Sequence, residues 1–146
     1  MSVLIGCLGR SYSDSFERGG WVKVFYPDAQ TKKLQYYSQF FKTAEMDATF
    51  YEKFYMHMTK DTFTAMDRAT PDNFQFSLKV PETVTHDKRL DVSKGAMALL
   101  DEFYEKISTL KSANKLGAVL IQLPPSFTVK EFQNTEQFLD RTSEGI

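Results

Sequence analysis

Short apolar segments alternate along the chain with segments in which apolar residues recur every three or four positions, as in a helix. This alternation is the feature that most constrains how the chain folds. The apolar segments have strand length, and residues 74–80 also alternate between apolar and polar side chains, as strands do. Residues 43–48 are assigned more weakly, because Glu45 and Asp47 are poor strand formers. The pattern predicts four strands, at residues 3–7, 43–48, 74–80 and 117–121.

Between these strands, apolar residues recur at helical spacing and predict helices at residues 34–41, 62–68 and 95–111. Thr128 and Glu131 form a capping-box pattern that predicts the start of a last helix. A strand followed by a helix, four times over, favours an α/β fold with a parallel sheet covered by helices. Residues 84–91 are expected to be a polar loop. Gly6 and Gly9 lack the third glycine of a dinucleotide-binding turn, so that function is disfavoured.

Composition excludes several classes of partner. The 146 residues carry a net charge of −1, so no global field attracts nucleic acid or an anionic membrane. No apolar run approaches the roughly 20 residues that span a bilayer, and no signal peptide is recognisable. The single cysteine, Cys7, excludes an intramolecular disulfide, and the expected location is the cytoplasm. Aromatic residues make up 14% of the chain, which suits core packing but also allows stacking on a ligand.

Five motifs, in order along the chain, resemble the YecE-like family, also called domain of unknown function 72. The most specific is the segment Glu45-Met46-Asp47-Ala48-Thr49-Phe50-Tyr51. The opening segment resembles the family pattern Gly-x-x-Gly-Trp-x-Tyr, with Arg10 where the family usually has Trp. Residues 52–59 also depart from the family pattern and are expected to form a divergent loop. The motifs lie at residues 5–12, 25–41, 45–51, 70–86 and 116–127.

The resemblance implies a (β/α)8 TIM-barrel-like fold, of which residues 1–146 would supply about the first four βα units as the N-terminal half of one incomplete domain. A complete barrel usually needs about 250 residues. A half-barrel has two open sheet edges, here the strands at 3–7 and 117–121. Open apolar edges invite pairing. We therefore expect self-association, or a second chain that covers these edges.

The site of a TIM-like barrel lies at the carboxyl ends of its strands. Glu45 and Asp47 are two residues apart on a predicted strand, so they point to one face. Two interpretations stay open for this pair. The carboxylates could act as acid and base or bind a divalent cation, with Lys79 as electrostatic stabiliser. Alternatively, Lys79 on the next strand holds Glu45 in a structural ion pair.

His86 follows the third strand and is a candidate general acid or base, with Arg89 nearby to hold a phosphate or carboxylate. The alternative is a solvated loop cluster. Tyr12 and Tyr51 are candidate ligand-stacking residues, although packing is the commoner role for a tyrosine. Gln122, at the end of the last strand, would either contact a polar substrate or satisfy a neighbouring side chain. Two scattered His and one Cys do not predict a zinc site.

Two functions from different classes follow. The chain is an enzyme, or part of one, that acts on a small polar or anionic ligand with Glu45, Lys79 and His86 as catalytic residues. Tyr12, Asp47, Tyr51, Arg89 and Gln122 would then contact the substrate, and the cofactor is left open between none and a divalent cation. Alternatively, the chain is a non-catalytic binding module, for nucleic acid among other ligands, or an inactive fragment. The reaction type is not predicted.

Overall fold

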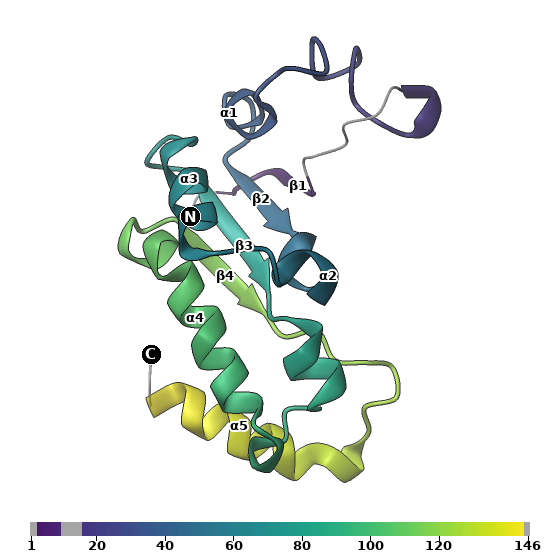
Figure 1. Ribbon diagram of the computed structural model, residues 1–146, viewed down its shortest axis with the longest axis vertical. Helices are drawn as coiled ribbons and strands as arrows, with labels where there is room; N and C mark the ends of the chain where they lie inside the picture. The colour runs from purple at the N-terminus through teal and green to yellow at the C-terminus, as the bar shows by residue number, and fades with distance from the viewer. Residues whose placement is uncertain (1–2, 10–15, 145–146) are drawn as a thin grey trace.

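The computed structural model describes residues 3–9 and 16–144 (Figure 1). Four parallel strands form one sheet in which each strand lies beside its neighbour in the sequence. This confirms the predicted α/β fold with a parallel sheet. The strands are β1 (Gly6–Leu8), β2 (Thr43–Met46), β3 (Gln75–Lys79) and β4 (Leu116–Leu120).

Helices follow the strands as predicted, and α4 and α5 are the longest. Thr128 and Glu131 form the predicted capping box, in which the Glu131 carboxylate accepts a hydrogen bond from the Thr128 amide at 2.9 Å. The prediction of a loop at residues 52–59 was wrong, because these residues include α2. The helices are α1 (Lys33–Tyr37), α2 (Glu52–Tyr55), α3 (Lys60–Arg68), α4 (Ala96–Ser112) and α5 (Phe132–Glu144).

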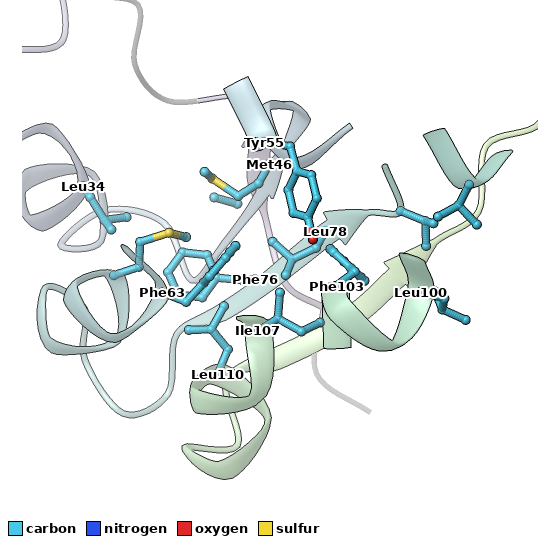
Figure 2. Close-up of a cluster of buried hydrophobic side chains, with 14 of the residues drawn as sticks. Leu34, Met46, Tyr55, Phe63, Phe76, Leu78, Leu100, Phe103, Ile107 and Leu110 are labelled. Carbon is cyan, nitrogen blue, oxygen red and sulfur yellow. The ribbon is translucent and has the colours of Figure 1, made fainter. Parts of the chain in front are cut away.

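The core lies between one face of the sheet and helices α3 and α4 (Figure 2). Strands β2 and β3 alternate, so that every second side chain is buried on this face. Phe76 and Leu78 of β3 are fully buried there. They belong to the same buried cluster as Phe63 of α3 and Phe103 of α4. In the segment 74–80, the apolar positions of the alternating pattern thus lie on the face of the sheet that the helices cover.

The segment at 84–91 is more ordered than the predicted polar loop. Residues Thr83–Asp87 form a π-helical turn, and Leu90 follows with a positive φ of 57°. Val84, Thr85 and Leu90 are buried. Because these three side chains enter the core, the segment packs against the end of the sheet rather than lying free in solvent.

The opposite face of the sheet is open in the part of the chain that the structure describes. The strand register places Leu8, Glu45, Ser77 and Ala118 in one row across this face. Leu8 and Ala118, at the two ends of the row, are exposed. Parallel sheets are normally buried on both faces. The open face therefore carries both the candidate site and the exposed apolar side chains of the edge strands.

Among the described residues, no helix combines the length and the apolar character needed to cross a membrane.

The packing of α4 against the sheet predicts a large loss of stability for Phe103→Ala. Phe103 is fully buried, so its truncation leaves a cavity. We expect the free energy of unfolding to fall by about 3–5 kcal/mol, measured by urea denaturation. Phe54→Ala is the control, because Phe54 is half exposed, and we expect a change of about 0.5 kcal/mol. Equal effects of the two substitutions would contradict this assignment of the core.

Candidate functional site

Three charged side chains meet at the carboxyl ends of the two central strands. Lys79, the last residue of β3, places its Nζ 2.6 Å from Asp47 Oδ1 and 3.3 Å from Glu45 Oε1. The Lys79 side chain is 13% exposed, and each carboxylate side chain is 35% exposed. We call Glu45, Asp47 and Lys79 the charge cluster. The sequence left open a pairing of Lys79 with Glu45, which the structure shows. The shorter contact of Lys79 with Asp47 was not predicted, because Asp47 lies in the turn after β2 and not on the strand.

Thr49 fixes the geometry of the charge cluster. It is buried in the short 3-10 turn Asp47–Thr49 that follows β2. Its hydroxyl donates to the Met46 carbonyl at 3.0 Å and accepts from the Lys79 amide at 3.1 Å. These two bonds tie the end of β2 to the end of β3. Sequence reasoning missed Thr49, because its partner on β3 is 30 residues away.

The charge cluster carries one positive and two negative charges, so a net negative charge remains. The hydrogen bond from Lys79 to Asp47 is the main cause that raises the pKa of Lys79 above its usual 10.5. The bond to Glu45 adds to this, while partial burial acts in the opposite direction. Lys79 is therefore held in its charged form and is already compensated by two carboxylates. Each carboxylate contacts Lys79 through one oxygen in the described part of the chain, and its side chain is 35% exposed, so a carboxylate oxygen can accept a further hydrogen bond.

The structural ion pair between Lys79 and Glu45, which the sequence left open, is therefore present. His86 makes none of the described contacts with the charge cluster. His86 lies in the π-helical turn, with its Nδ1 2.9 Å from the Thr85 hydroxyl. Its ring meets the ring of Phe50 edge to face, at 5.1 Å between centroids. The acid/base role of His86 stays a prediction.

Arg89 pairs with a residue that the site prediction did not include. Its guanidinium forms a bidentate ion pair with the Glu131 carboxylate, in which Nη2 donates to Oε2 at 2.7 Å. It also donates to the Ser126 carbonyl at 2.9 Å and stacks over the ring of Phe127. The described contacts of Arg89 join the segment that follows the π-helical turn to the start of the last helix. Its role as a substrate-binding residue is untested.

The other predicted contact residues lie apart from these groups. Tyr51 is partly exposed and packs edge to face against Phe50 and Phe54. Gln122 is exposed just beyond β4. Tyr12 and Arg10 lie outside the described residues.

The surface pockets of the described part of the chain lie away from the charge cluster. Four have volumes of about 440 to 780 Å³, and none of the four is lined by a residue of the charge cluster. The described residues also contain no group of three or more His, Cys, Asp or Glu side chains that could hold a metal ion. The charge cluster is thus an open, one-sided arrangement on the uncovered face of the sheet.

The four parallel βα units, with charged residues at the strand ends, define an α/β protein consistent with a TIM-barrel-like fold. Comparison with known families then identifies its family. Residues 8–146 match the model of the protein family of unknown function DUF72, and the chain belongs to this family. The resemblance to the YecE-like family is therefore confirmed, since the two names describe the same family.

Individual relatives agree with this assignment. The chain is 34% identical over 106 residues to the UPF0759 protein YunF of Bacillus subtilis, covering 70% of this chain and 36% of YunF. It is similar to the crystal structure of a DUF72 family protein of Thermotoga maritima, with 27% identity and a TM-score of 0.70, covering 94% of this chain and 51% of that one. A DUF72 family protein of Enterococcus faecalis shares the fold, with a TM-score of 0.58 at 22% identity over 73% of this chain and 42% of that one. The chain thus spans between about a third and a half of these relatives.

The Arg89–Glu131 pair predicts a pH dependence. Hydrogen bonds from Arg89, and then from the Thr128 amide, lower the pKa of Glu131 from 4.5 to about 2. Because the folded pKa lies below the unfolded one, the stabilisation is full above about pH 4.5 and disappears as the pH falls toward 2. We expect Glu131→Gln to lower the free energy of unfolding at pH 7, and by progressively less from pH 4.5 to pH 3.

Denaturant unfolding of both chains across this pH range measures the difference. Glu136→Gln is the matched control, because Glu136 is exposed on α5, the helix that follows the capping box. An effect of Glu131→Gln that stays constant with pH would contradict the role of this carboxylate.

Proposed function

We propose that this chain is one half of a (β/α)8 barrel, and that its charge cluster forms one side of a binding site for a small polar molecule. Four consecutive parallel βα units and the partial match to longer family members support the half-barrel. In barrels of this class the site lies at the carboxyl ends of the strands. Glu45, Asp47 and Lys79 occupy that end of β2 and β3.

The observation that carries the proposal is the double pairing of Lys79. A single ion pair needs one carboxylate, but here two carboxylates share one ammonium group, at 2.6 and 3.3 Å. The excess negative charge and the partly exposed carboxylate side chains suit a ligand that presents hydroxyl or amino groups, or a hydrated cation. An anionic ligand is expected to bind more weakly, because the positive charge of Lys79 is already compensated by two carboxylates.

Binding is the function that this geometry supports best. Binding of nucleic acid finds little support, because the chain has a net charge of −1 and the charge cluster adds a local negative charge. Catalysis would need a further acid/base group. His86, in the π-helical turn that follows β3, is the predicted candidate. Its described contacts are with Thr85 and Phe50.

The proposal is tested by following the backbone amide signals of the isotope-labelled chain by NMR during titration with four probes. These are erythritol for hydroxyl groups, ethanolamine for an amino group, Mg²⁺ for a cation and inorganic phosphate for an anion. We expect at least one of the first three probes to shift the signals of residues 45–49 and Lys79 in a saturable way. Phosphate is expected to bind those residues more weakly.

Two variants and a control identify the groups that bind. Glu45→Gln and Asp47→Asn each remove one carboxylate charge with little change in shape, so the affinity should fall at least tenfold. Glu102→Gln is the matched control, because Glu102 is paired with Lys106 at 2.9 Å on the exposed face of α4. The proposal is wrong if none of the first three probes gives saturable shifts at residues 45–49, or if Glu45→Gln and Asp47→Asn leave the affinity unchanged.

A further inference from the structure

We propose that Glu82 is a positioning residue of the candidate site. Its carboxylate and its amide hold the chain that follows the turn after β2, and through that turn they keep Asp47 against Lys79. The effect of Glu82 on ligand affinity rests on the proposed function, whereas the position of Asp47 is measurable without a ligand.

Asp47 needs support from outside its own turn. It opens the three-residue 3-10 turn that follows β2, and the pairing of β2 with β3 ends one residue before it. Within the turn, the Phe50 amide donates to the Asp47 carbonyl at 3.0 Å. Short 3-10 turns have poorer hydrogen-bond geometry than α-helices. Contacts from another segment are therefore needed to keep the Asp47 carboxylate 2.6 Å from the Lys79 ammonium.

Glu82 makes two hydrogen bonds to the residues that follow this turn. Its amide donates to the Phe50 carbonyl at 2.8 Å, and its Oε1 accepts from the Glu52 amide at 2.8 Å. Glu52 is the first residue of α2, where backbone N–H groups have no partner within the helix. Glu82 thus clamps the chain on both sides of Tyr51 and ties the start of α2 to the segment after β3 (Figure 1).

The backbone of Glu82 is itself anchored on both sides. Val80 continues the sheet, because its amide donates to the Leu120 carbonyl at 2.9 Å, and its side chain is fully buried. On the other side, Val84 and Thr85 of the π-helical turn are fully buried. Short π-helical segments are frequent at functional sites. The clamp therefore transmits the position of the sheet and of the π-helical turn to the turn after β2.

Thr49 and Glu82 act on opposite ends of the same short segment. Thr49 accepts from the Lys79 amide at 3.1 Å within the turn, and Glu82 holds the two residues on either side of Tyr51 beyond it. Without Glu82, the segment after the turn would lose a fixed point, and Asp47 would sample more positions. A carboxylate that must be ordered during binding adds an entropic cost, so ligand affinity would fall.

Three substitutions of Glu82 separate its hydrogen bond from its charge. Glu82→Ala removes both. Glu82→Gln removes the charge but keeps an oxygen that can accept from the Glu52 amide, and Glu82→Asp keeps the charge on a side chain one methylene shorter. If Glu82 acts through its hydrogen bond, the Ala and Asp variants should lose the positioning effect and the Gln variant should retain it.

The first measurement uses the ligand-free chain. Nuclear Overhauser contacts between the Lys79 Hε and Asp47 Hβ protons report the position of Asp47. We expect Glu82→Ala and Glu82→Asp to weaken these contacts and to speed hydrogen exchange of the Glu52 amide by about tenfold or more, because that amide loses its acceptor. Glu82→Gln should keep both near their wild-type values.

The second measurement is affinity for erythritol, ethanolamine and Mg²⁺. For each probe that binds the wild-type chain, the Ala and Asp variants of Glu82 should bind about tenfold more weakly, and the Gln variant should bind as the wild type does. Asp87→Ala is the matched control, because Asp87 is an exposed carboxylate at the other end of the π-helical turn. It should leave the contacts, the exchange rate and the affinity unchanged.

The outcomes distinguish this proposal from the binding function. Unchanged contacts between Lys79 and Asp47 in Glu82→Ala would overturn it, as would an unchanged affinity in a variant that has lost those contacts. A Glu82→Gln variant that behaves like Glu82→Ala would also overturn it, because the charge would then be the active feature. Far-UV circular dichroism checks folding, and Glu82→Asp decides if Glu82→Ala does not fold. If no probe binds the wild-type chain, the binding function fails, while the ligand-free comparison still decides the role of Glu82.

Discussion

The structure depends on a parallel sheet that has cover on one face only. Parallel sheets are stable when helices or other strands bury both faces, because their side chains on both sides are largely apolar. Here α3 and α4 bury one face, with Phe76 and Leu78 at its centre. The other face presents Glu45, Ser77 and Lys79 between the exposed leucines of β1 and β4. The candidate site lies on the face that this asymmetry leaves uncovered.

The charge cluster is also a structural device at the end of this sheet. The Thr49 hydroxyl and the Lys79 ammonium each connect the end of β2 to the end of β3. A buried hydroxyl that both donates and accepts leaves no unsatisfied group, so the turn after β2 is well defined. The carboxylates of Glu45 and Asp47 are therefore held in place before any ligand arrives, which is the condition for a preorganised site.

The sequence predicted those parts of the fold and site that depend on local periodicity or on neighbouring strands. The strands, α3, α4 and the Thr128–Glu131 capping box follow from local patterns. The meeting of Glu45 with Lys79 follows because consecutive βα units place their strands side by side. The pairing of Arg89 with Glu131 and the π-helical turn around Thr85 were not predictable. They depend on side chains 42 residues apart and on burial, which no local pattern encodes.

Covering the open face would change the electrostatics of the charge cluster. Glu45 lies in the same row as Leu8, so a layer that buries Leu8 also removes water from Glu45. Loss of water costs free energy for a charged carboxylate unless its partner stays in place, and Lys79 is already positioned 3.3 Å away. Asp47 lies beyond the end of β2, in the turn that follows the strand. Within the proposed barrel, Glu45 would be the more covered carboxylate and Asp47 the more accessible one, and both would keep an oxygen beside Lys79.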